Sequence, residues 1–139
     1  MILVFAVGGV VLLLDQLSKR LVQMHLAHRC ISWGTLLRIR PAMNLRAICR
    51  RAGSRALLTL VWITALLSAF LLYRSGAWFQ TPLALCGLGL AFGGAAGNLW
   101  DMLHRHYILD FIELQWWPVF NLADVAIIAG IAAAFWRQI

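Results

Sequence analysis

Acidic residues are rare in this chain, and most of them lie in segments that are otherwise apolar. Only five of the 139 residues are Asp or Glu. Asp110 lies in the stretch ILDFI, and Asp124 lies in the stretch FNLADVAI. A carboxylate at membrane depth is costly, so it usually faces the protein interior or a water-filled cavity and indicates function. These two acids are therefore the first candidates for chemistry.

Asp110 and Asp124 could act as a pair. Two carboxyl groups that share one site cannot both ionise easily, so such a pair holds one proton between them. Its ionised member can take a proton from water, and its protonated member can donate to a carbonyl oxygen, which is the chemistry of aspartic peptidases. Two structural roles compete with this hypothesis. Asp124 could simply stabilise the positive end of a helix dipole, and Asp110 could be a solvated loop acid.

Other polar residues are spaced so that packed helices would bring them to the same end of the molecule. Asn98 and Asp101 are three residues apart. Asp15 and Lys19 are four residues apart with the acid first, which is the favourable order for a helical ion pair. Asn44 belongs to the same side by simple topology. Antiparallel packing of neighbouring helices would gather these side chains near the two candidate acids.

Asn121 is the expected start of the last helix. Asn is a good N-cap residue, and Asp124 would then lie in the first helical turn. Pro118 is tolerated at a helix start, where its missing N–H costs little. The sequence therefore predicts that this helix begins near Val119 or Asn121, after an interfacial segment that contains Trp116 and Trp117.

Other catalytic chemistries have weaker support. The sequence contains neither a G-x-S-x-G motif of serine hydrolases nor an H-E-x-x-H motif of zinc peptidases. His25 and His28 are three residues apart, and His104 and His106 are two apart, so a metal site or a small metal transporter is an alternative. Interfacial polar residues are the simpler interpretation. We expect no metal and no cofactor.

The composition indicates that these residues belong to a membrane protein. The chain is 63% hydrophobic and 12% charged, with a mean hydropathy of +0.82. An ordinary soluble domain is about 45–50% apolar and about 25% charged. We expect a single domain over residues 1–139. The three cysteines are odd in number and without metal-like spacing, so we infer no disulfides from them.

Four segments are apolar enough to cross a bilayer, which requires roughly 20 mostly apolar residues in a helix. They are residues 1–14 with a helical pattern that continues to about 26, residues 56–73, residues 82–100 and residues 119–136. The predicted fold is therefore an all-α membrane protein with four transmembrane helices and both termini on one side. The first segment lacks a basic region before it and a cleavage site after it, so we expect it to be retained.

Two segments refine this arrangement. Apolar residues alternate around Gly34 and Pro41 in the segment 27–55, which predicts a short strand or hairpin at the membrane interface. Gly89, Gly93 and Gly97 share one helix face because they are spaced by four. Small residues at this spacing allow close helix packing, and a groove that admits a peptide is the alternative.

Basic residues are concentrated on one side of the predicted bundle. Ten of the twelve lie between or near the facing ends of helices one and two, or between helices three and four, and only Arg74 and Arg137 lie on the other side. The positive-inside rule would put the basic side in the cytoplasm. Attraction to anionic lipid headgroups explains the charge better than nucleic acid binding, because no soluble domain carries the patch.

The motifs DQLSK, AFGGAAGNLWD, ILDFI and FNLADVAI, in this order, resemble those of lipoprotein signal peptidase, the bacterial signal peptidase II. The resemblance covers most of the chain and is most specific over residues 93–128. It implies an aspartic endopeptidase of the bacterial cytoplasmic (inner) membrane that cleaves prolipoproteins before a lipid-modified cysteine. It also implies an extracytoplasmic active site, cytoplasmic termini and a small β-rich cradle after helix one. We expect lipid-modified prolipoproteins and membrane lipids as partners, no nucleic acid, and a monomer.

The resemblance assigns the catalytic role to Asp110 and Asp124. The supporting positions that it implies are Asp15, Lys19, Asn44, Asn98, Asp101 and Asn121. Three features depart from the family pattern. Met102 stands where the family has Arg, Arg46 stands where the loop motif has Gly, and the implied orientation puts the basic side outside. These departures leave open a non-catalytic or altered-specificity paralogue that binds lipopeptides.

Overall fold

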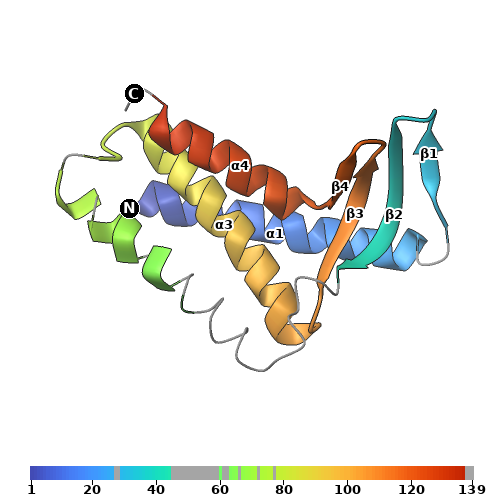
Figure 1. Ribbon diagram of the computed structural model, residues 1–139. Coiled ribbons are helices and arrows are strands. Elements are labelled where there is room, and N and C mark those ends of the chain that lie inside the picture. The colour runs from blue at the N-terminus through green and yellow to red at the C-terminus, as the bar shows by residue number, and fades with distance from the viewer. Residues whose placement is uncertain are drawn as a thin grey trace.

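Figure 1 shows the computed structural model, which describes residues 1–26, 29–44, 60, 63–65, 67–71, 73–76 and 78–136. Its labelled helices are α1 (Ile2–Leu26), α3 (Pro82–His104) and α4 (Leu122–Phe135). Its strands are β1 (Ile31–Trp33), β2 (Leu37–Asn44), β3 (Ile108–Leu114) and β4 (Trp117–Phe120). The strands form one sheet at one end of the molecule, and α1 begins and α4 ends at the other end (Figure 1).

The helices agree in part with the predicted spans. Among the described residues, α1 and α3 are the helices that are long and apolar enough to cross a membrane, and α4 is a shorter apolar helix of 14 residues. Within the second predicted span, residues 60, 63–65, 67–71 and 73 are helical. The remainder of that span lies outside the described residues.

Glycines let the helices of the bundle pack closely. A Cβ atom on Gly93 would lie 2.5 Å from the Gly8 carbonyl oxygen of α1. On another face of α3, a Cβ atom on Gly87 would lie 2.6 Å from the Gly130 carbonyl oxygen of α4. Real side chains do not approach backbone this closely, so α3 must present glycine to both neighbours. The packing interpretation of the glycine spacing is confirmed.

The sheet is antiparallel, with strand order β1-β2-β3-β4. The predicted hairpin is present, because β1 and β2 pair within residues 31–44. The register between β2 and β3 is irregular between Ile39 and Ala42, where Pro41 cannot donate a backbone hydrogen bond. Ala42 then pairs with Asp110, and Asn44 pairs with Ile108.

The structure corrects two details in the last third of the chain. The connection between α3 and α4 supplies half of the sheet that follows α1, so the fold is mostly helical with a four-stranded sheet rather than all-α. Helix α4 begins at Leu122 with Asn121 as its N-cap, so the predicted start near Asn121 is confirmed, and the alternative start near Val119 is wrong because Val119 belongs to β4. Short apolar strands resemble the first turn of a buried helix in sequence, which explains the error. Pro118 fits β4 because β4 is an edge strand.

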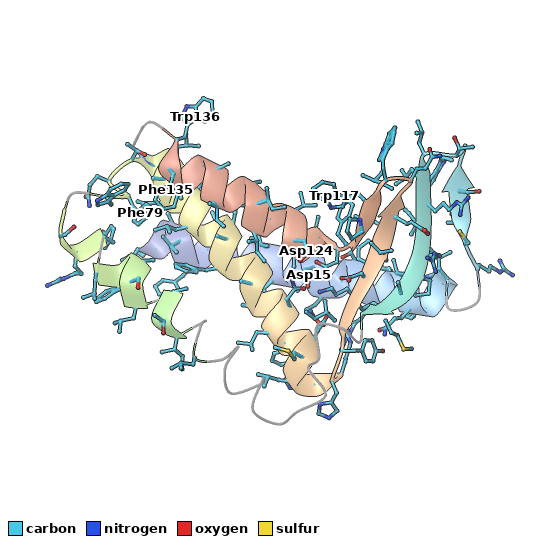
Figure 2. The ribbon with its side chains drawn as sticks, viewed as in Figure 1. Asp15, Phe79, Trp117, Asp124, Phe135 and Trp136 are labelled. Atoms are coloured by element: carbon cyan, nitrogen blue, oxygen red, sulfur yellow. The ribbon has the colours of Figure 1, made fainter. Side chains whose placement is uncertain are left out.

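Burial in this molecule is inverted relative to a water-soluble protein. Asp15, Lys19 and Asp101 are fully buried, whereas large apolar side chains such as Ile2 and Phe5 on α1 are 88% and 73% exposed. Aromatic residues lie at both ends of the molecule, with Phe79, Phe135 and Trp136 at one end and Trp117 in the sheet at the other (Figure 2). Exposed apolar helices around buried charges are what a lipid solvent favours.

Candidate functional site

The polar residues gather where α4 begins, between the helices and the sheet. Asp15 of α1 and Asp124 of α4 lie near each other in this region (Figure 2). The site contains two groups of side chains that share hydrogen bonds. We call the first the charged cluster, made of Asp15, Lys19, Asp101 and Arg105. We call the second the acid–amide cluster, made of Asn98, Asp110, Asn121 and Asp124.

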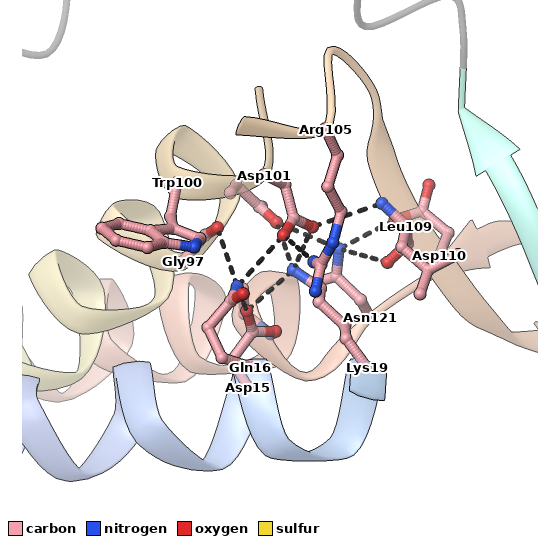
Figure 3. A network of polar contacts seen from close by, with 12 residues as sticks. Asp15, Gln16, Lys19, Gly97, Trp100, Asp101, Arg105, Leu109, Asp110 and Asn121 are labelled. Carbon is pink, nitrogen blue, oxygen red and sulfur yellow. Dashed lines mark hydrogen bonds and ion pairs between the residues drawn. The ribbon is translucent and has the colours of Figure 1, made fainter. Parts of the chain in front are cut away.

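The charged cluster joins α1 to the end of α3. Lys19 Nζ lies 2.7 Å from Asp15 Oδ2 and 2.8 Å from Asp101 Oδ2, and all three side chains are fully buried. Arg105 forms a further ion pair with Asp101. Gln16 donates to both acids at 3.1 Å. Figure 3 shows these side chains converging between the two helices. Two acids and two cations leave the cluster neutral, so each charge within the cluster has a counter-charge.

Local helix geometry builds this cluster. Asp15 and Lys19 are four residues apart on one face of α1, and Asp101 and Arg105 are four apart at the end of α3. Gly97 leaves space for the approach, because a Cβ atom there would lie 2.5 Å from Asp15 Oδ2. Glycine at position 97 therefore admits a carboxylate between two helices.

The charged cluster also fixes the backbone directly before each candidate catalytic acid. Asp101 Oδ2 accepts a hydrogen bond from the backbone N–H of Leu109 at 3.3 Å. Asp15 Oδ1 accepts one from the backbone N–H of Ala123 at 3.1 Å. Leu109 precedes Asp110, and Ala123 precedes Asp124. One neutral ionic cluster thus positions two acids that come from different elements.

The acid–amide cluster holds the two candidate acids through Asn121. Its side-chain Nδ2 donates to Asp110 Oδ1 at 2.8 Å. Its side-chain Oδ1 accepts from the Asp124 backbone N–H at 3.0 Å, and its own backbone N–H donates to Asp124 Oδ2 at 3.1 Å. This reciprocal pair is a capping box at the start of α4. The predicted N-cap role of Asn121 is confirmed, and each acid lies one hydrogen bond from it.

Asn98 connects the two clusters. Its Oδ1 accepts from Lys19 Nζ at 3.2 Å and from Asn121 Nδ2 at 3.0 Å. Its Nδ2 donates to Asp124 Oδ1 at 2.8 Å. Because Lys19 can only donate, it fixes which side of the Asn98 amide carries the oxygen. The amide group must therefore face Asp124 with its N–H.

The two acids differ in exposure. Asp110 is 3% exposed on β3, and Asn121 is fully buried. Asp124 is only partly buried. Within the described ranges, every buried side-chain nitrogen and oxygen atom has a hydrogen-bond partner. The arrangement is therefore preorganised, with one acid in the interior and the other at the edge that solvent reaches.

Most of the residues predicted for the site come together in the structure. Seven share the network just described, namely Asp15, Lys19, Asn98, Asp101, Asp110, Asn121 and Asp124. The backbone of Asn44 pairs with Ile108, two residues before Asp110. Arg46 lies outside the described residues. Asp110 is not a solvated loop acid, because it is buried within a strand.

Sequence reasoning missed Gln16 and Arg105. Arg105 contacts Asp101, whereas Met102, at the position where the resemblance implies an arginine, is buried and 5% exposed. The i,i+4 spacing of Asp101 and Arg105 was the available signal. Gln16 carries no comparable signal beyond its position next to Asp15.

An ion pair outside the site links two strands of the sheet. Arg40 Nε of β2 lies 2.5 Å from Glu113 Oε2 of β3. The hydrogen bond from Arg40 holds the pKa of the Glu113 carboxyl below its ordinary value. Since both side chains are partly exposed, this pair is the surface counterpart of the buried charged cluster.

Two of the four histidines contact the backbone of their own helices. His25 Nδ1 lies 3.0 Å from the Leu21 carbonyl oxygen, and His104 Nδ1 lies 3.1 Å from the Trp100 carbonyl oxygen. His28 lies outside the described residues. Within the part of the chain that the structure describes, no three His, Cys, Asp or Glu side chains form a group that could hold a metal ion.

The helices expose large apolar side chains, as expected of a membrane protein. Two aspartates are joined through Asn121, so the site can catalyse proton transfer with a pair of carboxyl groups. A family model described as Signal peptidase (SPase) II matches residues 7–139. The lipoprotein signal peptidase of Rhodococcus jostii is 36% identical in an alignment 138 positions long, which covers 93% of this chain and 68% of the relative. That of Halothermothrix orenii is 31% identical in an alignment 141 positions long, which covers 98% of this chain and 97% of the relative.

A solved structure described as a bacterial membrane enzyme matches the fold with a TM-score of 0.81. The match covers 98% of this chain and 94% of the other at 20% sequence identity. The chain belongs to the signal peptidase II family of membrane aspartic peptidases. The family resemblance drawn from the four motifs is thus confirmed.

Proposed function

We propose that the chain removes signal peptides from diacylglyceryl-modified prolipoproteins, with Asp110 and Asp124 as its catalytic acids. Cleavage would occur directly before the lipid-modified cysteine. One observation carries the assignment of the acids. Asn121 is hydrogen-bonded to both acids, and the charged cluster fixes the residue before each of them. The names of the relatives support the substrate class.

The reaction needs one water molecule and one proton shared by the two acids. The ionised carboxylate takes a proton from the water molecule while the water oxygen attacks the scissile carbonyl carbon. The protonated acid donates to the carbonyl oxygen, which gives a neutral tetrahedral diol. The acid that took the proton from water then donates it to the leaving nitrogen as the C–N bond breaks, while the other carboxylate takes a proton back from a hydroxyl of the diol. The products are a new carboxyl terminus and a new amino terminus, and the pair again holds one proton.

The remaining polar residues position this pair. Asn98 and Asn121 orient the carboxyl groups through their amides. Asp15, Lys19 and Asp101 hold the elements that carry the acids, at no net charge together with Arg105. Asn44 lies in β2 beside the start of β3, and we expect it to help bind the substrate near Asp110. None of these roles requires a metal or a cofactor.

An apolar cavity next to the site supports a lipid-modified substrate. It has a volume of about 330 Å³ and lies between α3, α4 and a segment that contributes Ala65, Ser68 and Ala69. Ala95 and Ile127 line it, and they lie one helical turn from Asn98 and Asp124. Apolar substrate parts, either acyl chain or signal peptide, could therefore lie in lipid-like surroundings with the scissile bond at the acids.

We also propose that four helices cross the bacterial cytoplasmic membrane, of which α1 and α3 are long and apolar enough to do so by themselves. Helix α4 has 14 residues, so it rises only about 21 Å, whereas the hydrocarbon core is about 30 Å thick. The site at its N-terminus would then lie below one membrane surface, under the sheet. In this placement the sheet is extracytoplasmic and both termini are cytoplasmic. We also propose that the protein acts as a monomer.

Cleavage of a diacylated model prolipoprotein by purified protein tests the proposal. Asp110→Asn and Asp124→Asn should each abolish cleavage while leaving helical content and thermal unfolding close to those of the wild type. Glu113→Gln is the matched control, because it neutralises another acid of β3 that faces Arg40 rather than the site. Normal turnover by either Asp variant would refute the assignment of the acids.

The same assay separates a second candidate function. Met102, which is buried where the family pattern has an arginine, favours a paralogue that binds lipopeptides without cutting them. Wild-type protein that binds the diacylated substrate but leaves it intact would establish that function. Turnover by the wild type would exclude it.

A further inference from the structure

A second cavity lies between α1 and the end of α3, on a different face from the apolar cavity beside Asp124. Its volume is about 440 Å³. Leucines of α1, including Leu13 and Leu17, form its apolar part together with Gly9. Arg20 and Arg105 line its polar end. We call this cavity the α1–α3 groove. Gln16, which donates to Asp15 and Asp101, also lines it, whereas no member of the acid–amide cluster does.

The groove has the length and polarity of one lipid leaflet. Gly9 and Arg20 are eleven residues apart on α1, which is about 16 Å along the helix axis. Half of a typical hydrocarbon core is about 15 Å. Leu13 is 67% exposed and Leu17 is 49% exposed, so both present apolar surface to whatever fills the groove. Trp100, which is typical of the headgroup level, lies beside Gln16 near the charged cluster (Figure 3).

The polar end of the groove carries positive charge. Arg20 is exposed and forms no ion pair with any other described residue. Arg105 and Lys19 both pair with Asp101, but the Arg105 side chain remains 19% exposed. A guanidinium group matches a phosphate with two parallel hydrogen bonds. The groove therefore complements a phosphate attached to an acyl chain.

Gly9 contributes space rather than packing. A Cβ atom on Gly9 would meet nothing within 4 Å, whereas one on the neighbouring Gly8 would lie 3.3 Å from the Gly89 carbonyl oxygen. Helix packing thus explains Gly8 but not Gly9. The missing side chain at position 9 widens the apolar end of the groove.

We propose that the α1–α3 groove binds one anionic phospholipid, with an acyl chain along Gly9–Leu17 and its phosphate at Arg20 and Arg105. This inference is independent of the proposed catalytic acids and requires only that the chain resides in a membrane. It gives a structural role to part of the basic excess at the sheet end of the molecule. The occupant is a membrane lipid rather than the substrate, because the groove is separate from the acids.

Native mass spectrometry of the purified full-length protein tests this proposal. The probes are phosphatidylglycerol and phosphatidylcholine with identical acyl chains, added singly in a lipid titration. Wild-type protein should retain phosphatidylglycerol about fivefold more strongly, which is the effect of one basic residue near an anionic headgroup. Equal retention of the two lipids would overturn the anionic preference and leave only non-specific filling by lipid.

Two variants separate the contributions of charge and shape. Arg20→Gln should abolish the preference for phosphatidylglycerol, and Gly9→Leu should weaken retention of both lipids by filling the groove without a clash. Arg29→Gln and Ala6→Leu are matched controls. The first removes a positive charge and the second adds a large apolar side chain, each at an exposed position outside the groove. Circular dichroism confirms that each variant is folded. Unchanged lipid retention in both groove variants would refute the site.

A competition experiment identifies the source of the lipid. A diacylated lipopeptide added in excess should leave the bound phosphatidylglycerol in place. Displacement of phosphatidylglycerol by the lipopeptide would assign the groove to the substrate and overturn the assignment to a membrane lipid.

Discussion

The charged cluster and the acid–amide cluster both contain aspartates, but the first pairs its aspartates with cations and the second with neutral amides. In the charged cluster, the aspartates at positions 15 and 101 accept from Lys19 and Arg105 at full burial. In the acid–amide cluster, Asp110 and Asp124 accept from the neutral amide groups of Asn98 and Asn121. The two kinds of carboxyl environment are neighbours, because Asn98 is hydrogen-bonded to both clusters.

The difference indicates which acids can move a proton. Adding or removing a proton in the charged cluster would leave a buried charge without compensation, which costs several kcal/mol. Neutral amides impose no such charge balance on the carboxyl groups that they orient. The charged cluster is thus suited to fix the backbone, and the acid–amide cluster is suited to react. Each prediction below tests one side of this contrast.

The largest effect is expected where the charge balance is broken. Lys19→Met removes the cation shared by Asp15 and Asp101, so it should lower the free energy of unfolding by about 3–5 kcal/mol. Chemical denaturation in detergent micelles measures this change. Arg20→Gln is the control, since it removes the next positive charge from an exposed position and should leave stability unchanged. A Lys19→Met variant as stable as the wild type would contradict a structural role for the charged cluster.

Removing the central amide should damage activity more than stability. Asn121→Ala deletes the hydrogen bond to Asp110 and the N-cap of α4, and loss of a cap costs about 1–2 kcal/mol. Loss of one preorganised donor should lower kcat about 100-fold. Thr81→Ala is a matched control, because Thr81 caps α3 far from the acids. If both variants lose equal activity, capping rather than orientation of the acids explains the effect.

Arg105 should have an intermediate effect. Arg105→Gln removes the outer partner of Asp101, while Lys19 and Gln16 still hold that acid. Because Arg105 is partly exposed, we expect a loss of about 1 kcal/mol in stability and a several-fold lower kcat with unchanged KM. Arg105→Lys should restore part of kcat, since it keeps the charge. An increase in KM alone would show that Arg105 contacts substrate instead of positioning Asp101.

The sequence predicted the members of the network better than their connections. Asp15 with Lys19, and Asn121 with Asp124, have helical spacings that specify local pairing. Asp110 stood out because it lies in an apolar stretch, and the resemblance to signal peptidase II then assigned roles to this acid and to the amides around it. The bonds from Leu109 and Ala123 to the charged cluster could not be predicted, because they depend on how α1 meets β3 and α4 in three dimensions.

The sheet was predicted only in part for a related reason. Residues 31–44 alternate around a glycine, which indicates a hairpin. The strands β3 and β4 lie in an apolar, Trp-rich segment directly before a helix, and no periodicity separates such strands from a helix start. Pairing with β2 on one side and β4 on the other makes β3 a central strand, and β2 is far from β3 in the sequence.

The smallest effect concerns the surface ion pair, which has the same chemistry as the charged cluster without its burial. Hydrogen bonding to Arg40 lowers the pKa of Glu113 below its ordinary value of 4.5. A carboxyl group with a lowered pKa in the folded state stabilises the protein above its ordinary pKa, and this contribution is lost as the pH falls through the lowered value. The Tm difference between wild type and Glu113→Gln should therefore be small at pH 7 and should shrink as the pH falls below 4.5. High salt should shrink it at pH 7. A Tm difference as large as that of Lys19→Met would show that burial does not make the ion pairs of the charged cluster more stabilising than this exposed one.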